Sequence, residues 1–131
     1  MKRFSLALVA TLLLVAATPV FALTPHSPVL IETDAAQPIT INAGEEFFIA
    51  LASNPSTGYS WTQTLSDDVT LAYEGNVRQP PATQMPGAPG QQIFIYHANR
   101  SGTAQITLTY SRPFETNTPA AKTLVFNITV H

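Results

Sequence analysis

A hydrophobic period of two recurs along this 131-residue chain and restricts its fold more than any other feature. Residues 102–110 and 122–130 each largely alternate apolar and polar side chains over their whole length. The apolar positions are Ala104, Ile106, Leu108 and Tyr110 in the first segment and Leu124, Phe126, Ile128 and Val130 in the second. Such alternation indicates a β-strand with one buried and one solvent-facing side. We therefore predict a strand in each segment and a fold built from sheets.

Shorter segments supply the remaining strands of this fold. Strands are predicted at residues 46–51, 59–65 and 92–97, and weaker candidates lie at 29–31, 39–41 and 69–73. No segment between residues 23 and 131 has the apolar stripe of a helix. Seven or eight short strands separated by turn residues predict an all-β, immunoglobulin-like antiparallel β-sandwich. Trp61 lies early in the third main strand, where immunoglobulin-like sandwiches bury a tryptophan, so we expect it in the core.

The N-terminal segment has the features of an export signal. Lys2 and Arg3 precede an apolar run at residues 6–17, and Val20-Phe21-Ala22 fits the small-x-small pattern of a cleavage site. The run is shorter than the ~20 residues of a membrane-spanning helix, which favours a cleaved signal over a permanent anchor or a buried N-terminal helix. We predict a signal peptide at residues 1–22 and a single exported domain at 23–131. The product is expected to be periplasmic or secreted, with no membrane association after cleavage.

Composition excludes several classes of function. The chain has no cysteine, which rules out disulfides, a thiol nucleophile and thiolate metal sites. Its net charge is −2, with no basic cluster to neutralise phosphates, so we expect no nucleic-acid partner. The three histidines are not at metal-ligand spacing, and no nucleophile, phosphate-loop or dinucleotide motif is present. We therefore expect no metal, no cofactor and no enzymatic activity.

Three loop segments stand out from this background. The first is Asn54-Pro55-Ser56-Thr57-Gly58-Tyr59, in which Asn54 can form a side-chain turn, Pro55 fixes its own φ and Gly58 permits a positive φ, leaving the Ser56 and Thr57 hydroxyls to point outward. The second is residues 86–90, with Gly87, Ala88, Pro89 and Gly90, inside a proline-rich stretch expected to be a long exposed loop. The third is Arg112-Pro113-Phe114 at the end of a strand. Taken singly, each is also compatible with an ordinary turn, and Phe114 with a ring folded onto the core.

Taken together and in this order, with Trp61, the three loops resemble the chagasin family of cysteine-protease inhibitors. That family carries an Asn-Pro-x-Thr-Gly-aromatic loop, a Gly-rich loop and an Arg-Pro-aromatic loop on an immunoglobulin-like sandwich. The resemblance runs from about Ile39 to the C-terminus. Ser56 replaces the usual threonine and keeps its hydroxyl, Pro89 replaces a glycine, and Phe114 replaces the more usual tryptophan.

The resemblance implies a monomeric, reversible inhibitor of papain-like cysteine proteases. The three loops would emerge at one end of the sandwich and enter the active-site cleft as a wedge, with Ser56 and Thr57 near the catalytic thiol. The alternative is a secreted adhesion or carbohydrate-binding module, with Tyr59, Trp61, Tyr96 and Phe114 as stacking surfaces. The two hypotheses differ on Trp61, which the alternative places exposed on a flat sheet face and the inhibitor hypothesis buries.

Overall fold

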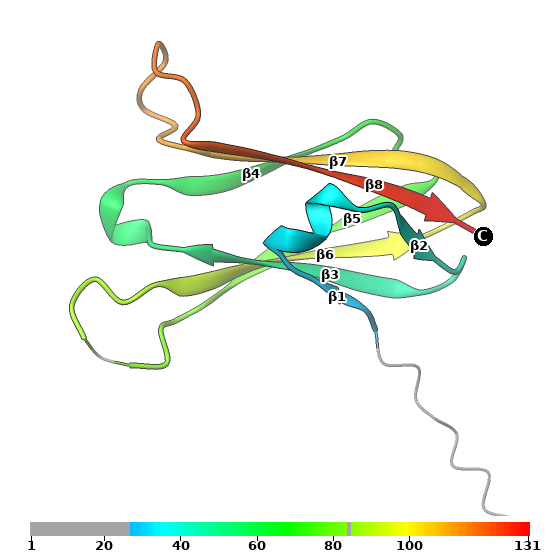
Figure 1. Cartoon of the computed structure of the whole chain (residues 1–131), viewed down its shortest axis with the longest axis horizontal. Helices are drawn as coiled ribbons and strands as arrows, with labels where there is room; N and C mark the ends of the chain where they lie inside the picture. Colours follow the sequence, from blue (N-terminus) through cyan, green and yellow to red (C-terminus); the bar gives the residue numbers. More distant parts are fainter. Residues whose placement is uncertain (1–26, 84) are drawn as a thin grey trace, which may run out of the picture.

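The computed structural model describes residues 27–83 and 85–131, which form two four-stranded sheets packed face to face (Figure 1). In chain order the elements are β1 (Val29–Leu30), the 3₁₀ helix η1 (Glu32–Ala36), β2 (Ile39–Ile41), β3 (Glu46–Ser53), the 3₁₀ helix η2 (Pro55–Thr57), β4 (Ser60–Leu65), β5 (Leu71–Gln79), β6 (Gly90–Ala98), β7 (Gly102–Ser111) and β8 (Lys122–Val130). One sheet has the order β1-β3-β6-β5 and the other β2-β8-β7-β4. The predicted all-β sandwich is confirmed. The predicted signal peptide lies outside the described residues.

The two short edge strands depart from the antiparallel prediction. The six long strands pair with one another only in antiparallel fashion. The short strands differ, because β1 pairs with β3 and β2 with β8 in parallel. Neither short strand is joined to its partner by a hairpin. The 3₁₀ helix η1 lies between β1 and β2 and carries the chain from one sheet to the other (Figure 1). Across the part of the chain that the structure describes, no helix is long and apolar enough to cross a membrane.

Strand β5 is the element that the sequence predicted least well. Its predicted range was residues 69–73, whereas the strand runs from Leu71 to Gln79 with a register shift between Tyr73 and Gly75. As an edge strand it pairs only with β6, and most of its second half is exposed, so it lacks the apolar alternation of the central strands. The β5–β6 loop is correspondingly shorter than the predicted one and begins at Pro80.

The core lies between the sheets and uses the predicted inward faces. Trp61 is 4% exposed, and Phe47 stacks on the buried Tyr96 at 5.4 Å between ring centroids. Burial raises the pKa of the Tyr96 hydroxyl well above its usual value, so this core tyrosine stays neutral at any physiological pH. The remaining buried apolar residues are Leu30, Ile39, Ile41, Ile49, Leu51, Leu71, Phe94, Ala98, Ala104, Ile106, Leu108, Phe126, Ile128 and Val130.

Side-chain hydrogen bonds join the two sheets around Trp61. The amide of Gln92 in β6 pairs with the backbone of Trp61 in β4, accepting from its N–H and donating to its carbonyl, both at 3.2 Å. The Trp61 indole N–H donates to the carbonyl of Ala52 in β3 at 3.0 Å. The two Gln92 bonds satisfy backbone groups of Trp61 on β4, an edge strand that has no neighbour on that side. They also fix the strands from which the β3–β4 loop emerges.

The burial of Trp61 predicts a distinct fluorescence signal. Because Trp61 is the only tryptophan, native emission should be shifted to shorter wavelength and resist quenching by acrylamide and iodide. Unfolding in guanidinium chloride should shift the emission to longer wavelength and restore quenching. Strong iodide quenching of the native protein would contradict the buried position and return the sheet-face alternative to consideration.

Candidate functional site

Three loops project from the same end of the sandwich (Figure 1). We call residues 54–59 between β3 and β4 the first loop, residues 80–89 between β5 and β6 the second loop, and residues 112–121 between β7 and β8 the third loop. Strands β3 and β5 both run antiparallel to β6, so they deliver the chain to the same end. The opposite end holds the start of β1 and the end of β8. The segments singled out in the sequence are therefore neighbours in space.

The first loop is a compact turn stabilised from within. Pro55–Thr57 form the 3₁₀ helix η2, and Gly58 ends it with φ +83°, in the left-handed region that favours glycine. The Gly58 N–H donates to the Pro55 carbonyl at 3.0 Å, and the Thr57 N–H donates to the Asn54 carbonyl at 3.2 Å. Gly58 has the positive φ predicted for it, and Pro55 begins η2, so the loop is a defined turn.

The hydroxyls of this loop are engaged inside it, which differs from the expectation that they point outward. Thr57 Oγ1 donates to the Asn54 carbonyl at 2.7 Å and accepts from the Tyr59 N–H at 3.4 Å. Ser56 Oγ donates to the Asn54 side-chain oxygen. A short hydroxyl side chain next to a turn finds these local partners readily. Pro55, Ser56 and Thr57 nevertheless remain exposed and form the tip of the loop.

Asn54 joins the first loop to the second. Its side-chain N–H donates to the Gly87 carbonyl at 3.2 Å, and its backbone N–H donates to the Tyr110 hydroxyl at 3.3 Å. Gly87 has φ +78°, and the Ala88 N–H donates to the Met85 carbonyl at 3.1 Å, so this part of the second loop is also a defined turn. The anticipated side-chain turn at Asn54 is replaced by this contact between loops.

One predicted site residue lies just after the second loop and is not on the surface, and one exposed residue of the loop was missed. Gly90 is buried at the start of β6, and a Cβ there would collide with the Gln79 carbonyl of β5. Its role in the structure is to let β5 and β6 approach, whereas Pro89 is exposed and Ala88 is partly buried. Met85 is 72% exposed beside the turn. An apolar side chain inside a Pro- and Gly-rich loop was the available signal for it.

Phe114 lies on the surface of the third loop. The residue is 70% exposed, so the alternative in which the ring folds onto the core is wrong. Its ring edge touches the first loop, where a Cβ at position 58 would lie 3.1 Å from the ring Cζ atom. A side chain at position 58 would therefore crowd the Phe114 ring, and it would also require a positive φ. Pro113 is exposed beside Phe114.

A column of stacked side chains runs from the third loop into the core. The Arg112 guanidinium lies 4.6 Å from the centroid of the Tyr59 ring. Tyr59 contacts Tyr110 at 5.2 Å, and Tyr110 stacks on Trp61 at 4.8 Å between ring centroids. Stacked aromatic pairs and a cation over a ring face are each stabilising. The column connects the first and third loops to the buried part of the sandwich.

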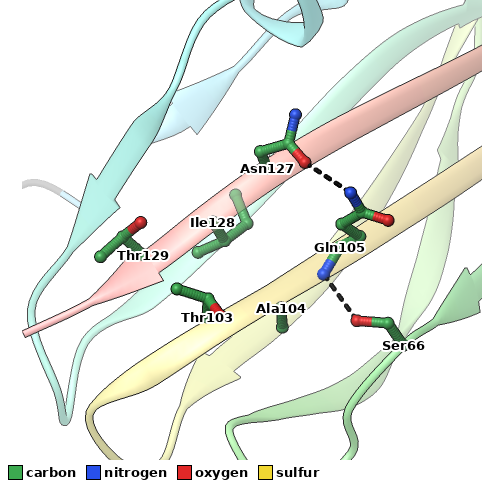
Figure 2. A pocket seen from close by; sticks show the side chains of 7 residues that line it. All are labelled: Ser66, Thr103, Ala104, Gln105, Asn127, Ile128 and Thr129. Carbon is green, nitrogen blue, oxygen red and sulfur yellow. Dashed lines mark hydrogen bonds between the residues drawn. The ribbon is translucent and has the colours of Figure 1, made fainter.

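The outer face of the β2-β8-β7-β4 sheet holds a different kind of hollow (Figure 2). It is lined by short side chains, including Thr103 and Thr129, and crossed by a hydrogen bond from the Gln105 side chain to Asn127 at 2.9 Å. No aromatic ring lines it, and the Trp61 and Tyr96 rings are buried. The carbohydrate-binding alternative required an exposed Trp61, and that requirement is not met.

Acidic side chains and histidines do not gather at the loop end. Within residues 27–83 and 85–131, no group of three or more His, Cys, Asp or Glu side chains lies close enough to hold a metal ion. The ion pair near the loops joins Arg112 and Glu115 at 3.1 Å. The exposed loop residues include proline, glycine, hydroxyl and aromatic side chains and Met85, which suit contact with a complementary surface.

Comparison with known proteins agrees with this geometry. The chain is 33% identical to chagasin from Trypanosoma cruzi over 81 residues, covering 58% of this chain and 73% of chagasin. It is 30% identical to amoebiasin-2 from Entamoeba histolytica over 83 residues, covering 63% and 68% of the two chains. The crystal structure of a cysteine protease inhibitor from Entamoeba histolytica superposes with a TM-score of 0.73 at 26% identity, over 82% of this chain and 99% of that one. A family model described as Chagasin family peptidase inhibitor matches residues 40–130, and the chain therefore belongs to the chagasin family.

Proposed function

We propose that the protein is a reversible inhibitor of papain-like cysteine proteases and acts by inserting its three loops into the active-site cleft. The observation that carries this proposal is the grouping of the loops at one end, with Asn54 hydrogen-bonded to Gly87 and Phe114 packed on Gly58. Family membership supports it, as does a structural relative described as a cysteine protease inhibitor. The protein is a binding partner of an enzyme and is not itself an enzyme.

The proposed protease-binding residues are those predicted from the sequence: Asn54, Pro55, Ser56, Thr57, Gly58, Tyr59, Gly87, Ala88, Pro89, Gly90, Arg112, Pro113 and Phe114. We add Met85 because it is exposed beside them. Their exposure divides these residues between two roles. The exposed ones would touch the enzyme, whereas buried Gly90 and the partly buried Asn54 and Tyr59 would hold the exposed ones in place.

A loop of this shape is suited to blocking a cleft without being cut. The hydrogen bonds of η2 and the left-handed Gly58 keep the backbone compact, so the loop does not offer an extended peptide to the catalytic thiol. A surface that is already ordered loses little conformational entropy on binding. Because the chain has no cysteine, it offers no thiol for exchange with the catalytic cysteine.

Export is part of the proposal. Residues 1–22 would act as a cleaved signal peptide, and residues 23–131 would reach the periplasm or the exterior as a monomer. A domain without cysteines needs no oxidation to fold there, so its stability rests on the buried core described above.

The direct test is a titration of residues 23–131 against papain and, separately, trypsin. We expect one molecule of inhibitor to block one molecule of papain, activity to return on dilution, and the inhibitor to remain uncut. Trypsin should be unaffected because it lacks the open cysteine-protease cleft. Inhibition of trypsin alone, or of neither enzyme, would refute the proposal, and a Thr103→Ala variant at the opposite end should behave like the original chain.

A further inference from the structure

We propose that Arg112 is a positioning residue, which holds the first loop in its binding shape and does not itself contact the protease. The inference rests on the proposed inhibitory function and deepens it. It changes the role that the sequence suggested for Arg112, which was placed among the protease-contacting residues. Its basis is that the Nε, the Nη1 and the central carbon of the guanidinium all contact groups of the protein itself.

The Arg112 guanidinium is engaged on three sides by the protein's own groups. Its Nε–H donates to the Thr57 carbonyl at 3.1 Å, and its Nη1 donates to the Glu115 carboxylate at 3.1 Å. Its Cζ atom lies over the Tyr59 ring, 4.6 Å from the ring centroid. A guanidinium would bind a carboxylate or a carbonyl of an enzyme through these same N–H groups, and an aromatic ring through its planar face. Two of its five N–H donors are therefore committed to groups of the protein itself.

The bond to Thr57 acts at the point that sets the direction of the first loop. Thr57 is the last residue of η2, where a helix leaves carbonyl groups without partners inside the helix. Arg112 donates a hydrogen bond to one of these carbonyls, that of Thr57, directly before the left-handed Gly58. This bond fixes the peptide plane between Thr57 and Gly58, and with it the orientation of the tip.

Glu115 has a supporting part in the same arrangement. It lies on the third loop with Arg112, and its N–H donates to the Arg112 carbonyl at 3.1 Å, closing a tight turn. Its carboxylate holds the guanidinium through Nη1, whereas the first loop accepts from Nε, and the Arg112 and Glu115 side chains are 37% and 33% exposed. Glu115 therefore orders Arg112, and Arg112 orders Thr57 and Tyr59. Because Glu115 acts only through Arg112, the effects of substituting the two residues should not add.

The test measures Arg112→Ala, Arg112→Lys, Glu115→Gln and the Arg112→Ala/Glu115→Gln double variant in two ways. In the free protein, amide hydrogen exchange at Gly58 and Tyr59 reports how well the first loop is held. Against papain, association and dissociation rates are measured separately. Arg100→Ala is the matched control, because it removes the same charge from an exposed residue in the β6–β7 turn.

We expect Arg112→Ala to speed exchange at both amides and to slow association about tenfold, because only a fraction of molecules then holds the competent loop. Dissociation should change by no more than about twofold, since the contacts made by the competent form are unchanged. Glu115→Gln should give a smaller effect of the same kind, and the double variant should match Arg112→Ala. Arg112→Lys keeps the charge near Glu115, and its exchange and association rates should fall between those of the original chain and Arg112→Ala.

Two results would overturn the inference. One is unchanged exchange at Gly58 and Tyr59 in Arg112→Ala, and the other is a loss confined to dissociation while Glu115→Gln binds normally or better, which indicates a direct contact with the enzyme. If Arg112→Ala does not fold, Arg112→Lys and Glu115→Gln decide the question. Failure of the original chain to inhibit papain would refute the proposed function instead, while exchange in the free protein would still show whether Arg112 holds the loop.

Discussion

Truncating Phe114 to alanine is expected to weaken inhibition of papain by about 30-fold while leaving the thermal midpoint nearly unchanged. Exposed aromatic side chains at the centre of an interface are frequent hot spots, and losing one costs about 2 kcal/mol of binding free energy or more. Phe114 is such a residue, because its ring is exposed and is braced against the first loop at Gly58. The loss should appear mainly as faster dissociation. Stability should hardly change because no cavity forms in the core.

Two further variants sharpen this prediction. Phe114→Trp should match or improve inhibition, since it restores the residue that is usual in the family. Val77→Ala is the matched control, because Val77 is also an exposed apolar residue but lies on the outer face of the β1-β3-β6-β5 sheet. It should inhibit normally. A large fall in the midpoint of Phe114→Ala with unchanged inhibition would remove Phe114 from the binding surface.

Replacing Gln92 with methionine is expected to lower the free energy of unfolding by about 3 kcal/mol. The substitution keeps the size of the side chain but leaves the buried N–H and carbonyl of Trp61 without partners, and each unsatisfied buried group costs roughly 1–3 kcal/mol. It also removes the bond from Gln92 to Asn76 at 3.1 Å. For a domain of this size the thermal midpoint should fall by about 10–20 °C.

The neighbouring residue provides the control for this experiment. Gln91 is exposed on the opposite face of β6, so Gln91→Met should shift the midpoint by no more than a degree or two. Thermal unfolding followed by circular dichroism measures both variants. A Gln92→Met protein as stable as the original would show that water or a local shift replaces the lost bonds, and that the amide bridge between the sheets is dispensable.

The sequence predicted the long strands other than β5 because the alternation of apolar and polar side chains is a local pattern. The grouping of the loops was implied by the family resemblance and depends on the topology of the sandwich. Residues 102–110 and 122–130 largely alternate, and their predicted inward positions are buried in β7 and β8 except Tyr110 and Leu124, which are partly buried. Trp61 is buried as predicted. The three loops follow β3, β5 and β7, and successive antiparallel strands deliver such loops to one end.

The features that sequence reasoning missed depend on partners far along the chain. Gln92 is in phase with the inward-facing Phe94 and Tyr96, which marks it as a buried polar residue, but nothing local identifies Trp61 as its partner. The sequence indicates only that Arg112 is an exposed residue beside a proline, whereas its hydrogen bond to Thr57 joins residues 55 positions apart. Contacts of this kind appear only once the two sheets are packed.

The position of the end of β8 has a practical consequence for how the protein can be attached to something else. The start of β1 and the end of β8 lie at the end of the sandwich opposite the three loops (Figure 1). A linker placed after His131 therefore leads away from the loop tips. The protein can be immobilised on a bead or sensor, or joined to another domain, with its loops turned outward to capture an enzyme from solution.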